Sequence, residues 1–168
     1  AIVGPALNPL IQWALKREFK HVTDVASWQK IIAQYMGKMI KRSVSELTYS
    51  GLDKLQPGRG YLFISNHRDI TMDPALVSYG LDQQGLETPR VAIGDNLLQK
   101  PYVSDIMRLN KSFVVKRSAQ GIREKMKAYM DLSTYIDHSV HTGHNIWIAQ
   151  REGRAKDGID ATDVAVMK

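Results

Sequence analysis

The chain has 168 residues, of which 43% are hydrophobic and 24% are charged, so it is long enough for one domain with a substantial core. This composition excludes intrinsic disorder and low-complexity repeats. The absence of cysteine excludes thiol nucleophiles, disulfide scaffolds and cysteine-ligated zinc sites. A formal charge of +6 favours anionic partners, such as nucleic acid, acidic lipid or a phosphate-bearing substrate.

Two helices are expected in residues 1–44. Asn8 and Pro9 form a typical N-cap and first-turn pair, and an apolar stripe then runs towards Phe19. Ser27 is expected to cap a second helix, in which apolar residues recur every three or four positions. This second stripe has two interpretations: a surface that faces the core, or an interfacial membrane helix with Trp and Met side chains in the lipid.

From residue 45 the pattern changes to alternating strands and helices. A strand-like alternation at 46–49 is followed by buried strands expected at 60–65, 90–93, 112–116 and 145–149. The intervening helices are expected at 73–81, at 103–109, and from Ser118 to just before His138, with Asp73 as a cap and Pro74 in the first helical position. This order predicts a single α/β domain over residues 1–168, with a mostly parallel sheet flanked by helices.

Three polar clusters follow the carboxyl ends of predicted strands, where ligands bind in parallel α/β sheets. The clusters are Asn66–His67 after the first buried strand, Lys116–Arg117 at the third, and residues 150–154 after the fourth. If these strands are neighbours, one edge of the sheet collects a histidine, several carboxylates and several cations.

His67 is the candidate base, because it directly follows a buried strand and precedes Asp69 and Asp73. An imidazole with an ordinary pKa of about 6.5 can take a proton from a hydroxyl group, and a carboxylate at its other nitrogen fixes the tautomer. Such a pair makes an alcohol nucleophilic. The alternative is structural, with His67 bonding a loop carbonyl and Asp73 only capping a helix.

Arg117 and Arg154 suit a phosphate group, which a guanidinium binds as a planar fork, and Lys116 adds a point charge. Glu152 and Gly153 indicate a tight turn that places a carboxylate among these cations. The alternative for each of these side chains is an ordinary solvated surface position.

Other chemistries are disfavoured by the sequence. The spacing of His138, His141 and His144 suggests metal binding, but Asp137 is their one acidic neighbour, so we expect no metal site. No Gly-rich phosphate loop is present, which argues against nucleotide chemistry. We also expect no nucleic-acid partner, because the aromatic residues do not interleave with cations on a predicted strand.

The segment 63–74 resembles the first block of the glycerolipid acyltransferase family, in which Asn-His follows a strand and an Asp lies downstream. Residues 112–117 resemble its second block, an apolar strand ending in Arg, and Glu152–Arg154 resemble its third; the likeness covers about residues 46–158. Two departures stand out. The spacing between His67 and Asp73 is one residue longer than in the family, and the third block is one residue shorter.

The resemblance implies transfer of a fatty acyl group from acyl-CoA or acyl-carrier protein to a hydroxyl of a phosphorylated glycerol or lysophospholipid, in phospholipid biosynthesis and with no further cofactor. His67 would be the general base and Asp73 its orienting partner, although the longer spacing leaves Asp69 as an alternative carboxylate. Direct attack in a ternary complex would need no acyl-enzyme. The residues expected to bind the substrate are Asn66, Lys116, Arg117, Glu152, Gly153 and Arg154.

The resemblance also sets expectations for the rest of the protein. A fourth block would lie beyond Lys168, so we expect this chain to be a fragment of the sheet. Apolar runs such as 61–65 are too short to cross a bilayer. We therefore expect a peripheral protein on the cytoplasmic side of a membrane surface. The alternative function is a catalytically silent lipid-binding or membrane-adaptor protein of the same fold.

Overall fold

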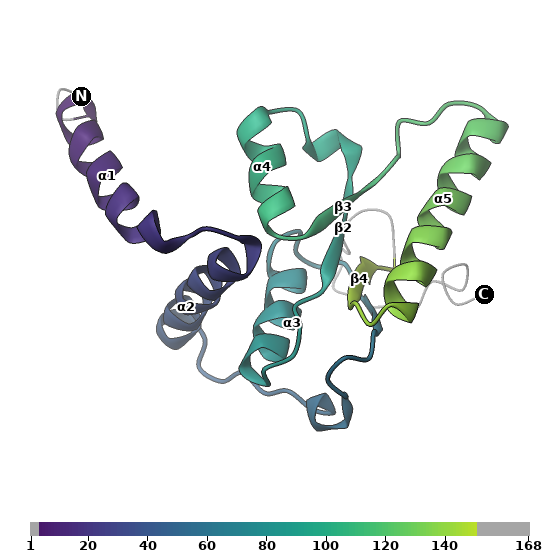
Figure 1. Cartoon of the computed structure of the whole chain (residues 1–168), viewed down its shortest axis with the longest axis horizontal. Coiled ribbons are helices and arrows are strands. Elements are labelled where there is room, and N and C mark those ends of the chain that lie inside the picture. Colours follow the sequence, from purple (N-terminus) through teal and green to yellow (C-terminus); the bar gives the residue numbers. More distant parts are fainter. Residues whose placement is uncertain (1–3, 151–168) are drawn as a thin grey trace.

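The computed structural model describes residues 4–150, which form a four-stranded parallel sheet flanked by helices (Figure 1). The strands are β1 (Leu62–Ser65), β2 (Arg90–Gly94), β3 (Ser112–Val115) and β4 (Ile146–Ala149). The helices are α1 (Gly4–Glu18), α2 (Val25–Ser43), α3 (Met72–Gln83), α4 (Pro101–Leu109) and α5 (Ile122–His141). Short 3₁₀ turns are η1 (Phe19–His21), η2 (Leu52–Lys54) and η3 (Asp95–Leu97). The predicted fold class, a parallel α/β sheet preceded by two helices, is confirmed.

The strands lie in the order β1-β4-β2-β3. The chain moves across the sheet in one direction from β1 to β2 and on to β3, and it returns from β3 to β4. Because crossovers between parallel strands are right-handed, the helices of the outward steps cover one face and the helix of the return step covers the other. Figure 1 shows this arrangement, with α3 and α4 on one side of the sheet and α5 on the other.

The register aligns the ends of all four strands at one edge, which we call the carboxyl edge. Ser65 pairs with Ala149, and Gly94 pairs with Val115. Strands β2 and β4 pair at Arg90–Ile146 and Val91–Trp147 and run parallel, so the ends of β2 and β4 point to the same edge. The loops that follow β1, β2 and β3 therefore begin in a single row together with the end of β4.

The inner strand β4 forms the centre of the core. Ile146 is fully buried and Trp147 is 3% exposed. Asn145, just before this strand, is also buried; its side-chain oxygen accepts a hydrogen bond from Tyr61 N at 3.0 Å, and its amide donates to Glu87 O at 2.7 Å. These bonds satisfy a buried polar group and join the starts of the strands.

The apolar stripe of α2 packs inside the protein. Trp28 stacks on Phe19 with ring centroids 5.6 Å apart and donates its indole N–H to Asn110 at 3.2 Å. The helix contacts α3 and α4, and Ile40 near its end is buried. The structure therefore favours the core-facing interpretation of this stripe. By contrast, α1 extends away from the sheet (Figure 1), with Trp13 58% exposed.

The expected starts of the first two helices are wrong. Asn8 is not a cap, because α1 begins at Gly4 and Pro9 lies inside it, where a proline costs the helix one backbone hydrogen bond. Ser27 is not the cap of α2 either. The Asp24 side chain caps this helix by accepting from Ser27 N at 2.7 Å, and the Ser27 hydroxyl accepts from Asp24 N at 3.2 Å, which completes a capping box.

Two further expected helix starts are corrected by side-chain hydrogen bonds. Asp73 and Pro74 do not open α3, which begins at Met72, because the Asp69 carboxylate already binds the backbone there. Ser118 does not cap α5, which begins at Ile122, since its hydroxyl donates to Asp95.

Helix α5 was expected to end before His138, but it continues to His141. Gly143, with a φ of 83°, then turns the chain towards β4. Residues 46–49 form no strand. Tyr49 there donates its hydroxyl proton to Leu76 O at 2.8 Å and packs on α3 instead of pairing with the sheet.

Candidate active site

The loop after β1 carries Asn66 and His67 at the carboxyl edge, as predicted. The Asn66 side-chain oxygen accepts a hydrogen bond from the amide of Gln150. Gln150 is 7% exposed, and its backbone N–H donates to Ser65 O at 2.9 Å. Two hydrogen bonds therefore tie the histidine loop to the end of the neighbouring strand β4. No individual role for Gln150 could be predicted from the sequence, since its bond to Asn66 depends on β1 and β4 being adjacent.

The imidazole of His67 faces the carboxylate of Asp73. His67 Nδ1 lies 3.7 Å from Asp73 Oδ2, and the two side chains are 14% and 18% exposed. This separation is too long for a hydrogen bond but short enough for an ionic contact. Among the described residues, the buried Nδ1 has no hydrogen-bond partner. Catalytic hydrogen bonds are often long in the unliganded state and shorten when substrate binds, so the arrangement suits a base that is completed by its substrate.

The position of Asp73 is fixed by the loop that it faces. Its Oδ2 accepts hydrogen bonds from Arg68 N at 2.7 Å and from Asp69 N at 3.0 Å. It also lies in the first turn of α3, where the helix dipole favours a negative charge. These fixed donors hold the carboxylate beside the ring of His67.

Asp69, the alternative carboxylate, serves the start of α3. Its Oδ1 accepts from Thr71 N at 2.8 Å and from Met72 N at 2.7 Å. This oxygen satisfies two N–H groups that a helix start leaves without intrahelical partners. The structure thus places Asp73 against the imidazole and commits an oxygen of Asp69 to the helix.

Lys116 and Arg117 follow β3 at the same carboxyl edge, and both are exposed. Asp95, which sequence analysis did not identify, accepts hydrogen bonds from Arg117 N at 3.2 Å and from Ser118 N at 3.1 Å. The hydroxyl and N–H of Ser118 lower the pKa of Asp95 below its ordinary value. This carboxylate thereby holds the β3 loop against the end of β2.

The structure brings five of the predicted site residues to one edge of the sheet: Asn66, His67, Asp73, Lys116 and Arg117. Strands β1 and β3 are separated by β4 and β2, so their loops begin about 14 Å apart at the usual strand spacing. The predicted residues Glu152, Gly153 and Arg154 lie outside the described residues.

Two other histidines, His141 and His144, pair with acids away from this edge. His141 Nδ1 lies 3.2 Å from Asp137 Oδ1 on the surface of α5. His144 Nδ1 lies 3.2 Å from Glu87 Oε2 where the strands begin. Over residues 4–150, no group of three or more His, Asp or Glu side chains is arranged to hold a metal ion.

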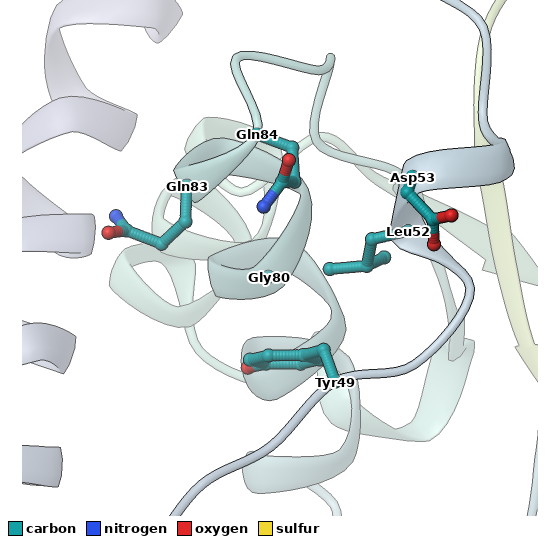
Figure 2. Close-up of a pocket in the computed structure, with 6 residues that line it drawn as sticks. All are labelled: Tyr49, Leu52, Asp53, Gly80, Gln83 and Gln84. Carbon is teal, nitrogen blue, oxygen red and sulfur yellow. The ribbon is translucent and has the colours of Figure 1, made fainter.

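A pocket of about 330 Å³ lies at the far end of α3 (Figure 2). It is lined by Tyr49, Leu52, Asp53, Gly80, Gln83 and Gln84. Asp73 lies at the start of α3, and a helix of 12 residues is about 18 Å long. The pocket is therefore separate from the His67–Asp73 pair.

Comparisons with known proteins give a consistent family. A family model described as Acyltransferase matches residues 46–158. A glycerol-3-phosphate acyltransferase of Xanthomonas axonopodis pv. citri is 30% identical over 86% of this chain, which covers 18% of that protein. A glycerol-3-phosphate acyltransferase of Pseudomonas syringae pv. tomato is 26% identical over 80% of this chain, which covers 16% of that protein. The chain spans less than one fifth of the length of these relatives.

Proposed function

The chain belongs to the glycerolipid acyltransferase family, and we propose that it carries the acyl-transfer site of an enzyme that acylates glycerol 3-phosphate. The donor would be a fatty acyl thioester of coenzyme A or of acyl-carrier protein. The observation that carries this proposal is the His67–Asp73 pair on the carboxyl edge, with the cations Lys116 and Arg117 on the same edge.

In the proposed reaction His67 is the general base. Its Nε2, on the side of the ring away from Asp73, accepts the proton of the acceptor hydroxyl while the hydroxyl oxygen attacks the thioester carbonyl. The tetrahedral intermediate expels the thiolate, which takes the proton from the imidazolium and leaves His67 neutral. The products are an ester and a free thiol. Transfer is direct, so both substrates must be held together in a ternary complex.

Asp73 is proposed as the orienting carboxylate, in preference to Asp69. A negative charge 3.7 Å from Nδ1 favours the tautomer with Nδ1 protonated and stabilises the imidazolium that forms during attack. The charge itself is held by the N–H groups of Arg68 and Asp69, which need not reorganise during the reaction.

The acceptor phosphate is assigned to the cations that follow β3, with Asn66 beside the base. Arg117 offers a planar fork to phosphate oxygens, and Lys116 adds a second positive charge. Glu152, Gly153 and Arg154 follow β4, the strand next to β1, and are proposed to complete this subsite.

The proposal is tested with the full-length protein by following acyl transfer to glycerol 3-phosphate from palmitoyl-CoA and, separately, from palmitoyl-carrier protein. His67→Ala should lower kcat by about 10²–10⁴-fold, the usual contribution of a general base. His141→Ala, which changes an exposed histidine on α5, is the matched control and should leave kcat unchanged. Equal rates for the parent and His67→Ala would remove His67 from the mechanism. A parent that binds lysophosphatidate without turnover would indicate the silent lipid-binding alternative.

We also propose peripheral contact with the cytoplasmic face of a membrane through α1. Leu10 is 63% exposed and Trp13 is 58% exposed on this helix, and the Arg17 guanidinium lies 5.4 Å from the centroid of the Trp13 ring. Apolar and aromatic side chains beside cations are typical of interfacial helices. Within residues 4–150, none of the helices combines the length and apolar character needed to span a bilayer. Flotation with anionic vesicles should fall for Trp13→Glu; unchanged flotation would contradict this role of α1.

A further inference from the structure

Gly94 is the last residue of β2 and occupies the middle of the row at the carboxyl edge. It pairs with Val115 of β3 on one side, and on the other side of β2 lies β4, which is followed by Gln150. Gln150 in turn binds Asn66, next to the proposed base. Any side chain that crosses Gly94 from the β3 side is therefore directed towards the His67 side of the sheet.

The Arg117 side chain crosses this position. A Cβ atom on Gly94 would lie 3.1 Å from both Cδ and Nε of Arg117. The backbone of Gly94, at φ −74 and ψ 145, is extended and open to any residue, so its conformation does not require glycine. The requirement is for space, because a contact at 3.1 Å is closer than well-packed carbon atoms approach.

The backbone of the same arginine is fixed by the residue that follows Gly94. One carboxylate oxygen of Asp95 accepts from Arg117 N at 3.2 Å, and the other accepts from Ser118 N and from the Ser118 hydroxyl. Gly94 and Asp95 thus act on opposite ends of Arg117. Asp95 anchors its main chain at the end of β3, while Gly94 leaves room for its side chain over β2.

We propose that Gly94 and Asp95 are positioning residues that direct the Arg117 guanidinium across β2 towards the histidine loop, where it binds the phosphate of the acceptor. This inference rests on the proposed function and deepens it, because it identifies what determines where the phosphate lies. An arginine on the edge strand β3 starts about 14 Å from the loop of β1. Directing it inward brings the phosphate subsite closer to the base, and a planar fork binds phosphate well only when its direction is fixed.

The test is a double-mutant cycle on glycerol 3-phosphate binding by the full-length protein, measured by calorimetry. A Cβ on Gly94 would also lie 2.3 Å from the Asn96 side-chain oxygen, so all variants carry Asn96→Ala to remove that second contact. The cycle compares this background with added Gly94→Ala, added Arg117→Ala, and both. Thermal unfolding of each variant checks that it folds.

Gly94→Ala should weaken glycerol 3-phosphate binding by about tenfold when Arg117 is present, and by less than about twofold when Arg117 is already alanine. Equal weakening in both backgrounds, or none in either, would overturn the inference. If Gly94→Ala does not fold, Asp95→Asn takes its place in the cycle. Asparagine has the shape of aspartate but one acceptor oxygen in place of two, so the hydrogen bonds from Arg117 and Ser118 to residue 95 are weakened.

Turnover of the unmodified protein separates the two claims. If it acylates glycerol 3-phosphate and Arg117→Ala weakens binding, but the cycle shows no coupling, the positioning role fails and the proposed function stands. If the unmodified protein does not bind glycerol 3-phosphate, both fail. Coupling in binding together with an unchanged kcat at saturating acceptor supports a role in positioning the phosphate rather than in the chemical step.

Discussion

His67 Nδ1 lies 3.7 Å from Asp73 Oδ2, and the same oxygen receives the N–H groups of Arg68 and Asp69. The carboxylate that faces the proposed base is therefore fixed by the backbone directly after His67. The ring lies in the loop after β1 and the acid lies in the first turn of α3, so one short segment of the chain holds both groups. This arrangement is well suited to a pre-organised proton acceptor.

Asp73→Asn should lower kcat by about 10²-fold or more, because an amide keeps the shape of the loop but removes the charge that stabilises the imidazolium. Asp69→Asn is the matched control. It should lower kcat by less than about tenfold and change the free energy of unfolding by less than about 0.5 kcal/mol, because asparagine keeps an accepting oxygen and caps a helix about as well as aspartate. Initial rates and urea unfolding of both variants provide the measurement. A larger kcat loss for Asp69→Asn would assign the orienting role to that residue instead.

Gln150→Leu should lower kcat/KM by about tenfold. The substitution removes the amide that donates to Asn66 while keeping a buried side chain of similar size. Without this amide the Asn66 side-chain oxygen loses its hydrogen-bond donor, and leaving a buried polar group without a partner costs about 1–3 kcal/mol. Because Asn66 is next to His67, we expect the loss to disturb the position of the proposed base. Gln83→Leu is the control. Gln83 is exposed at the end of α3 that lies away from Asp73, so this substitution should leave kcat/KM unchanged. Equal kcat/KM for the parent and Gln150→Leu would show that the Asn66 bond does not support catalysis.

Gly80→Ala should destabilise the fold, since a Cβ there would lie 2.6 Å from Cε1 of the Tyr49 ring. We expect a loss of about 1–3 kcal/mol in the free energy of unfolding, typical of an overpacked contact. Gly37→Ala is the control, because the atom nearest its Cβ would be the Tyr79 hydroxyl oxygen at 3.2 Å, while the ring carbons would lie at 3.6 and 3.8 Å, in ordinary contact. It should change stability by less than about 1 kcal/mol. Chemical unfolding measures both, and equal losses would contradict the ring contact.

The strands were predictable because each is a short apolar run with turn residues around it. Their parallel order followed from the helices between them, which is why Asn66, His67, Lys116 and Arg117 were correctly expected at one edge. The strand order β1-β4-β2-β3 was not predictable. It alone brings Gln150 beside Asn66, so the importance of that glutamine could not be seen in the sequence.

Helix starts were less predictable, because several side chains compete for the same backbone groups. Asp69 and Asp73 both suit a helix start, and only the folded loop shows that Asp69 binds the first N–H groups of α3 while Asp73 turns to His67. Ser118 has the residue type of a cap, but its hydroxyl donates to Asp95, a residue far away in the sequence. Local propensity cannot rank such long-range competitors.

Glu87 lies at the edge where the strands begin, between a lysine and a histidine. Glu87 accepts a hydrogen bond from Lys111 Nζ at 3.1 Å and lies 3.2 Å from His144 Nδ1. Partial burial disfavours ionisation of Glu87, but Lys111 and His144 outweigh it, so its pKa lies below the ordinary value of 4.5. The unfolded chain therefore binds this proton more readily than the folded protein. The stabilisation by Glu87 is fully present above pH 4.5 and is lost as the pH falls through its lower folded pKa.

Glu87→Gln should accordingly lower the free energy of unfolding near neutral pH by no more than about 1 kcal/mol, because the pair is partly exposed to solvent. The difference from the parent should shrink as the solution is acidified below pH 4.5, where the parent carboxylate takes up its proton. Urea unfolding of both proteins across this range measures the difference at each pH. A difference that stays constant or grows on acidification would show that Glu87 does not stabilise the fold through its charge.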